Sequence, residues 1–430
     1  MPDKPRKIGL HAAWAMAVGG MVGGGIFSAL GIVLSVAGRW APVSFLLAGV
    51  VAFITALNYT RLTRVFGEGG GAFTFLQEIK RERAADALAW VLIAGYTLTT
   101  GVYAFTFGHY LASAFSLGPV TARVAGVAIV VLLVAVNLLG VSQAAWVELV
   151  SVWGKLVILI VLAAAGYVMG SPARLFDHAS TGAGPLAALT GAAVVFMAYE
   201  GFELLSYDYE EMRQPGRTLI RAEVLAVLSV IAVYLIVCTG GVMLVGADAI
   251  IQHEEVSISV MGERAFGTAG RAIAAAAAVL STASAINATL FSTARLSRLV
   301  AKDHDLPGIF AKESKAGVPV WSVVVLGAAG ATFAAVGSLT RLVEAASFTF
   351  LVTFAIVNAL RALEVKDRRW LGWVGALLAG AAALVLAYRL ITEAWWVLAV
   401  LGAVVAGAFL TRPLLLERAG AGSRPPADPG

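Results

Sequence analysis

Two stretches decide the fold of this chain: GGMVGGGIF at Gly19–Phe27 and FMAYEGFELL at Phe196–Leu205. Each lies inside an apolar run that is long enough to span a bilayer. Five of the seven residues from Gly19 to Gly25 are glycine, and glycine costs roughly 1 kcal/mol against alanine inside a helix. The second stretch contains Glu200 and Glu203. Both patterns predict a helix that breaks within the membrane, which is tolerated only beside protein or a water-filled cavity.

The composition identifies the broad class as an integral membrane protein. Hydrophobic residues make up 60% of the chain and charged residues 13%, which is about half the charged share of a soluble domain. We predict an all-α protein with twelve transmembrane helices over these apolar runs: Leu10–Val36, Pro42–Tyr59, Ala87–Phe115, Val124–Leu139, Val147–Met169, Leu186–Leu205, Val224–Val245, Ala272–Thr293, Val318–Ser338, Leu342–Leu360, Trp370–Tyr388 and Ala394–Leu410.

The distribution of Lys and Arg predicts the orientation. If the N-terminus lies inside, the cytoplasmic segments hold 23 of the 31 basic residues, the opposite side holds seven, and Lys155 lies within a span. Basic residues favour the cytoplasmic side, so both termini are predicted to be cytoplasmic in a multi-pass protein of the cell membrane. The basic loops therefore need no nucleic-acid partner. The alternative of a cleaved signal peptide is disfavoured because the first run is too long and has its glycines in the middle.

The two unusual stretches lie in the first and sixth predicted spans. A spacing of five spans predicts a 5+5 inverted repeat, in which two discontinuous helices cross near the midplane and two accessory helices follow. The alternative for the glycines is close helix packing of the small-xxx-small type. The predicted organisation is a cytoplasmic segment at 1–9, repeats at 10–169 and 184–361, accessory helices at 370–411, and a disordered cytoplasmic tail at 412–430.

Four motifs, in order, resemble those of the amino acid, polyamine and organocation (APC) transporters. They are GGMVGGGIF, GEGGGAFTFLQE at Gly67–Glu78, FMAYEGFE with EEMRQPGRTLIRA at Glu210–Ala222, and NATLFSTARLSRLVAKDHDLP at Asn287–Pro307. The resemblance covers nearly the whole chain. It implies the LeuT-like fold and a substrate that is an amino acid or a related amine.

A broken helix offers backbone groups to a ligand. Unpaired N–H groups at the start of a second half-helix favour an anion, so Gly23, Gly24, Gly25 and Ile26 are predicted to face a carboxylate. The carbonyls of Ala198, Tyr199 and Glu200 would accept from an ammonium group. By resemblance Phe202 acts as a lid. The predicted substrate-binding residues are Val22, Gly23, Gly24, Gly25, Ile26, Ala198, Tyr199, Glu200 and Phe202.

Lys155 is a basic residue inside an otherwise apolar run. Burial disfavours the charged ammonium, which makes a proton carrier plausible. By resemblance to family members with a lysine here, its ammonium takes the place of a sodium ion between the first and eighth helices, with Ser281 and Ser284 as candidate partners. The alternative is that Lys155 snorkels to the cytoplasmic interface. Glu203 matches a position that is acidic in many family members and is the second candidate for proton coupling.

Other polar and aromatic residues leave alternatives open. Glu200 departs from the hydrophobic residue usual in the family, so it either favours a cationic substrate side chain or is satisfied by a neighbouring helix. Tyr103 is a further candidate for substrate contact, whereas Glu344 and His109 are expected to be structural. The aromatic residues at the breaks either wall the cavity or pack between helices: Phe27, Phe196, Tyr199 and Phe202.

We therefore expect a secondary active transporter that moves amino acids across the cell membrane by alternating access, with proton coupling and without sodium. The alternatives are an amino acid or polyamine exchanger, and a channel or nutrient sensor on the same fold. A membrane enzyme is disfavoured because the sequence has no convergent set of nucleophile, base or metal ligands. The single cysteine, Cys238, can form no intrachain disulfide, and neither a metal nor a cofactor is expected.

Overall fold

A computed structural model of the chain describes residues 7–422 apart from 68, 70, 141–144, 178–183, 303–305 and 315–316. Within that part every regular element is a helix. The α-helices are α1 (Leu10–Ala37), α2 (Ala41–Phe66), α3 (Gly71–Glu78), α4 (Glu82–Ala114), α5 (Pro119–Leu138), α6 (Ala145–Met169), α7 (Arg174–Asp177), α8 (Ala187–Val195), α9 (Pro215–Val245), α10 (Ala247–Gln252), α11 (Ser257–Lys302), α12 (Val320–Val336), α13 (Leu339–Glu364) and α14 (Arg369–Gly422). The 3-10 helices are η1 (Gly38–Trp40), η2 (Phe196–Tyr199), η3 (Glu203–Glu211), η4 (Glu254–Val256) and η5 (Gly308–Ala311).

Nine stretches of the described residues are long and apolar enough to cross a membrane. The stretch Leu10–Phe66 contains both α1 and α2, which η1 joins. The stretch Arg369–Val404 is the first part of α14 and has a kink at Ala394. Helix α12 is apolar but has only 17 residues. These stretches support a multi-pass membrane protein, whereas the count of twelve spans and the inverted repeat remain predictions.

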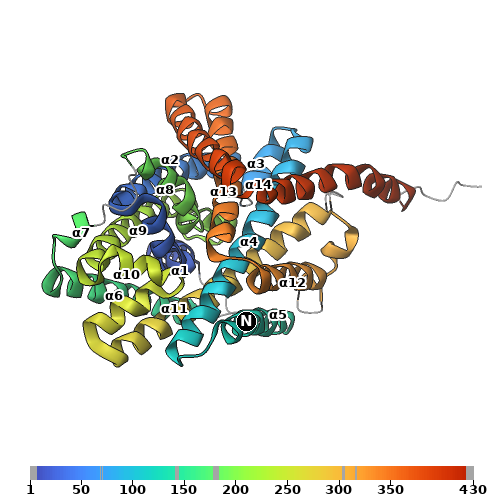
Figure 1. Cartoon of the computed structure of the whole chain (residues 1–430). Coiled ribbons are helices and arrows are strands. Elements are labelled where there is room, and N and C mark those ends of the chain that lie inside the picture. Colours follow the sequence, from blue (N-terminus) through green and yellow to red (C-terminus); the bar gives the residue numbers. More distant parts are fainter. Residues whose placement is uncertain are drawn as a thin grey trace, which may run out of the picture.

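Helix α1 lies in the interior of the bundle and contacts α6, α8, α9 and α11 (Figure 1). Helices α2 and α9 pack against each other, as do α4 and α11. Helix α13 pairs with α14, whose last turns extend away from the other helices (Figure 1). Residues 412–422 of the predicted tail belong to this helix, and residues 423–430 lie outside the described part.

The predicted break in the sixth apolar run is confirmed. Helix α8 ends at Val195 and continues as the 3-10 helix η2. The backbone then becomes extended at Glu200, with ψ of 149°, and turns at Gly201, with φ of +117°. A positive φ is strained for residues with a side chain, so glycine suits this position. The segment resumes as η3, again in 3-10 geometry.

The predicted break in the first apolar run is wrong, because α1 is one continuous helix from Leu10 to Ala37. Close packing around its glycines explains the difference. A methyl group added at Gly24 would lie 2.1 Å from the ring of Tyr103, and one at Gly23 would lie 2.7 Å from Ala285 Cβ. Neighbouring side chains therefore fill the space beside these glycines, and this packing offsets their low helix propensity.

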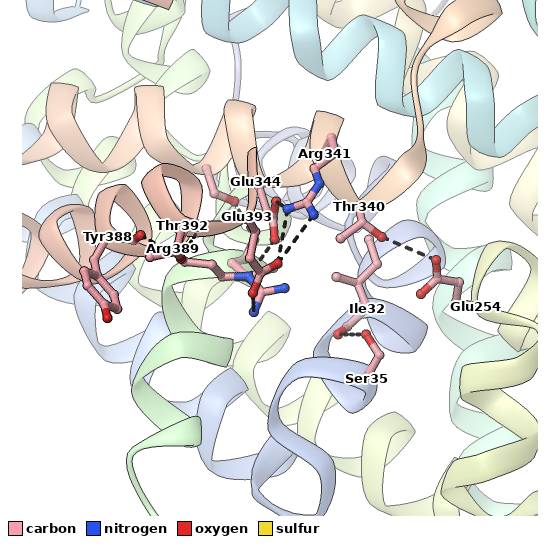
Figure 2. Close-up of polar contacts among 12 residues, drawn as sticks. Ile32, Ser35, Glu254, Thr340, Arg341, Glu344, Tyr388, Arg389, Thr392 and Glu393 are labelled. Atoms are coloured by element: carbon pink, nitrogen blue, oxygen red, sulfur yellow. Dashed lines mark hydrogen bonds and ion pairs between the residues drawn. The ribbon is translucent and has the colours of Figure 1, made fainter. Parts of the chain in front are cut away.

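A cluster of four charged residues joins α13 to α14 (Figure 2). Glu344 is fully buried and accepts from Arg341 Nη1 at 2.7 Å and from Arg389 Nε at 2.8 Å. Glu393 pairs with Arg389 at 2.9 Å and with Arg341 at 3.4 Å. Glu344 is thus a structural residue, as expected from the sequence, and we refer to these four residues as the arginine–glutamate cluster.

Candidate functional site

A cavity of about 580 Å³ lies between α1, the broken sixth segment and α11. Its volume falls within the range of small-molecule sites. At its inner end are Gly19 and Gly20 of α1 with Glu200 and Gly201 of the break. The other described lining residues are Met16, Asn137, Gly140, Leu204, Leu205, Tyr207, Asp208, Glu211, Ser284, Ala285, Asn287, Ala288, Thr289, Phe291, Ser292, Arg295, Gly317 and Val318.

Two glycines allow α1 and the broken segment to touch backbone to backbone. A methyl group added at Gly201 would lie 2.8 Å from the carbonyl carbon of Gly20, and one added at Gly20 would lie 3.2 Å from Gly201 Cα. The 2.8 Å contact at Gly201 is shorter than real Cβ atoms make. The atoms in the way belong to the backbone of Gly20, which cannot move aside as a flexible side chain could. The two stretches singled out from the sequence therefore meet at the inner end of the cavity.

Side-chain hydroxyls also tie α1 to its neighbours. The hydroxyl of Tyr234 on α9 lies 2.9 Å from the Met21 carbonyl and 2.7 Å from the Ala198 carbonyl, so its single proton is shared between these two acceptors. Ser281 on α11 donates to the Val22 carbonyl at 3.1 Å. These bonds hold the middle of α1 against both the broken segment and α11.

Lys155 on α6 points at the same region. Its side chain is 4% exposed, and Nζ donates to the Gly19 carbonyl at 3.0 Å. This burial contradicts the alternative of snorkelling to an interface. Ser281 bonds α1 three residues further along and Ser284 lines the cavity, so the lysine and its two candidate partners all lie around one segment of α1.

Glu200 and Glu203 are both buried next to the break. Glu203 Oε1 accepts from the Tyr96 hydroxyl at 3.0 Å, and its Oε2 accepts from the Gly201 backbone N–H at 2.9 Å. Glu200 Oε2 has a long contact of 3.5 Å with the Tyr103 hydroxyl, and its Oε1 has no hydrogen-bond partner in the described structure. Its side chain also lies beside the acidic Glu203. Glu203 is therefore satisfied by protein, whereas Glu200 is not.

The predicted substrate-binding residues of α1 are buried within the continuous helix: Val22, Gly23, Gly24, Gly25 and Ile26. None of them belongs to the described cavity lining. The same holds for Ala198, Tyr199 and Phe202, so Glu200 is the one predicted substrate-binding residue placed in the lining.

The aromatic residues at the breaks pack against other rings. Phe27 meets Tyr110 edge to face, with ring centroids 6.0 Å apart. Phe202 packs against Phe354 at 5.5 Å, and Tyr199 against Tyr234 at 5.1 Å. These contacts agree with the alternative in which the aromatics pack between helices.

Several polar residues of the site were not predicted. Tyr234 joins α1 to the break. Its position in the middle of an apolar run could have indicated this role, because the hydroxyl of a buried tyrosine needs a hydrogen-bond partner. Asp208 and Arg295 form an ion pair of 3.8 Å in the lining. Asn137 Nδ2 donates to Asn287 Oδ1 at 2.7 Å across the cavity wall, and amides inside spans are a comparable signal.

Comparison with known proteins places the chain among membrane transporters. A family model described as amino acid permease matches residues 8–413. An uncharacterized transporter of Mycobacterium tuberculosis strain H37Rv is 30% identical over 427 residues, which cover 97% of this chain and 94% of that protein. The serine/threonine exchanger SteT of Bacillus subtilis is 25% identical over 305 residues, covering 70% and 69%.

The b(0,+)-type amino acid transporter 1 of Homo sapiens is 25% identical over 359 residues, covering 80% of this chain and 72% of its own length. These relatives are transporters and not enzymes by name, and together with the apolar helices they support amino acid transport by a multi-pass membrane protein. The resemblance noted in the sequence is thereby confirmed: the chain belongs to the amino acid permease family.

Proposed function

We propose that the protein is a secondary active transporter of amino acids, works by alternating access, and is coupled to protons and independent of sodium. It resides in the cell membrane with both termini in the cytoplasm. The observation that carries this proposal is the bond from Lys155 Nζ to the Gly19 carbonyl, 3.0 Å long, at the inner end of the cavity.

Access from one side supports alternating access. The cavity reaches exposed residues at Glu211 and Gly317, both in segments that the charge distribution assigns to the cytoplasm. At the other end of α1, a methyl group added at Gly31 would lie 2.3 Å from Glu254 Cα, so η4 covers α1 closely there. Thr340 of α13 donates to Glu254 at 3.3 Å (Figure 2). A cavity open to one side and covered on the other suits one state of the cycle.

The position of Lys155 supports proton coupling. A protonated ammonium donates to the Gly19 carbonyl, whereas loss of the proton weakens that bond and removes a buried charge beside the cavity. Protonation of Lys155 thus biases how α1 packs on α6. Transport of a ligand is coupled to the proton when both bind one conformation of α1 more tightly than the other. The ammonium also supplies the positive charge that a sodium ion would otherwise bring.

The substrate is proposed to bind where Glu200 and Gly201 face Gly19 and Gly20. The backbone amides of Gly23 to Ile26 can meet a carboxylate only after α1 unwinds, because α1 is continuous here. We retain them as carboxylate ligands of a second conformation. Glu203 remains the second candidate for proton coupling.

Exchange is the second candidate function, because a relative that covers 70% of this chain is named as a serine/threonine exchanger. An exchanger requires amino acid on the inner side before it takes up labelled substrate. A proton-coupled symporter fills empty vesicles.

Uptake into sodium-free proteoliposomes tests both candidates. Labelled amino acids are offered with and without an inward proton gradient, and with the vesicles empty or preloaded. We expect accumulation in empty vesicles that depends on the gradient. Lys155→Ala should abolish the dependence of uptake on the proton gradient. Lys155→Arg keeps a charge that does not release its proton, so this variant should permit exchange but not accumulation. Normal uptake by Lys155→Ala with an unchanged pH profile would refute the coupling role.

A further inference from the structure

Glu200 is a buried acid with an unused oxygen. Its side chain is 1% exposed, it lines the inner end of the cavity, and Oε1 has no hydrogen-bond partner among the described residues. A carboxylate is costly to bury unless it is paired and hydrogen-bonded. The position therefore favours a ligand that brings its own positive charge.

The surrounding residues do not supply that charge. The Tyr103 hydroxyl is 3.5 Å from Oε2, which is at the limit of a hydrogen bond. Glu203 lies beside Glu200 and interacts with it through the side chain, but it is also acidic and already has two donors. Arg295, the one basic residue of the described lining, pairs with Asp208 at 3.8 Å. The ammonium of Lys155, which lies behind Gly19, donates to the carbonyl of that glycine.

The described lining as a whole is acidic. It contains Glu200, Asp208 and Glu211 but only Arg295 as a basic residue. Glu211 lies at the exposed end and Glu200 at the buried end, so the negative charge runs from the mouth of the cavity to its base. The excess of acidic over basic residues in the lining favours ligands of positive charge.

We propose that Glu200 selects substrates with a cationic side chain, and that its Oε1 accepts from the guanidinium or ammonium group of the bound amino acid. This inference rests on the proposed transport function and adds the substrate class. An Arg side chain suits the site because a guanidinium donates two parallel bonds to one carboxylate. The α-carboxylate of the substrate is then left to the amides of Gly23 to Ile26 in the second conformation proposed above.

Arginine and citrulline provide the test, because they have nearly the same shape and differ in the charge of the side chain. Uptake of each is measured in proteoliposomes of the full-length protein and of Glu200→Gln, which removes the charge and keeps the shape. Glu210→Gln is the matched control, since Glu210 is an exposed acid that lies outside the described lining of the cavity. Agmatine is arginine without the carboxylate, so its uptake shows whether the substrate must be an amino acid or can be any cationic amine.

We expect the unaltered protein to prefer arginine over citrulline by about tenfold or more, as for a hydrogen bond between charged groups. The preference should fall below about threefold in Glu200→Gln and persist in Glu210→Gln. Retained citrulline uptake by Glu200→Gln would demonstrate that this variant is folded and competent.

Different failures separate the two claims. Equal uptake of arginine and citrulline by the unaltered protein, with no change in Glu200→Gln, would overturn the role of Glu200 and leave amino acid transport intact. Uptake of agmatine but not arginine would overturn the claim that the cationic ligand is an amino acid. If no substrate is transported, the transport proposal fails. The role of Glu200 is then tested by binding alone, by comparing how far arginine and citrulline each raise the unfolding temperature of the protein.

Discussion

Replacing Tyr234 with phenylalanine removes the hydroxyl that joins α1 to the broken segment. That hydroxyl lies 2.9 Å from the Met21 carbonyl and 2.7 Å from the Ala198 carbonyl. Met21 is inside a continuous helix, so its carbonyl keeps a backbone partner. Ala198 lies just before the chain becomes extended at Glu200, and carbonyls at a helix end lack regular partners. The substitution therefore leaves a buried acceptor unsatisfied.

The matched control is Tyr199→Phe. Its hydroxyl donates to the Phe45 carbonyl at 2.8 Å, and Phe45 lies inside α2, where that carbonyl also has a helical partner. Loss of this bond should cost about 0.6 kcal/mol, the average for side-chain bonds between membrane helices. Loss of the Tyr234 hydroxyl should cost about 1–3 kcal/mol, the penalty for an unsatisfied buried group.

The protein supplies its own reporter of unfolding. Cys238 is the only cysteine of the chain and is fully buried, so its thiol reacts with a maleimide dye only when the structure opens. Heating the purified protein with the dye should give a lower midpoint for Tyr234→Phe than for Tyr199→Phe, with both below the unaltered protein. Equal midpoints, or the reverse order, would refute the view that Tyr234 satisfies the broken helix end.

Three further substitutions use the same thiol assay. Glu344→Gln leaves Arg341 and Arg389 with Glu393 as their charged partner in the cluster and should cost about 1.5–3 kcal/mol, the range for hydrogen bonds to charged groups; a loss under about 1 kcal/mol would contradict its structural role. Gly201→Ala must strain a φ of +117° and press on the Gly20 backbone, so we expect a loss of about 1–3 kcal/mol together with lost transport, and an unaffected variant would contradict the packing described. Thr60→Val removes the donor that lies 2.5 Å from Glu223 Oε2; it should cost about 1–3 kcal/mol, and Thr60→Ser should restore the stability if the hydroxyl is responsible.

The sequence predicted the broken sixth segment correctly because the cause is local. Glu200 and Gly201 form an acid followed by a residue without a side chain, and both resist a continuous helix in an apolar run. The glycines of α1 gave an equally strong local signal and the opposite outcome. Whether they break the helix depends on the side chains that pack on them, such as Tyr103 and Ala285, and these come from distant parts of the chain.

The same distinction applies to the candidate site. The sequence predicted that Lys155 lies near the first helix, but its observed partner is the Gly19 carbonyl, and a backbone oxygen leaves no signal in the sequence. Tyr234 and Arg295 take part through contacts across many residues, which only the packing of α9 and α11 determines. Glu200 could not be assigned from the sequence for a different reason. That its Oε1 lacks a hydrogen-bond partner becomes known only when the positions of all its described neighbours are known.

The arginine–glutamate cluster of α13 and α14 holds two positive and two negative side chains, so its formal charges cancel (Figure 2). Moving one unit charge through the membrane field is worth about 2.3 kcal/mol per 100 mV, but a neutral cluster that moves as a unit contributes almost nothing. The cluster can therefore shift with α13 and α14 during the cycle without itself responding to voltage. The voltage dependence of transport then comes from charges outside this cluster, among them the ammonium of Lys155, the carboxylate of Glu200 and the charge of the substrate.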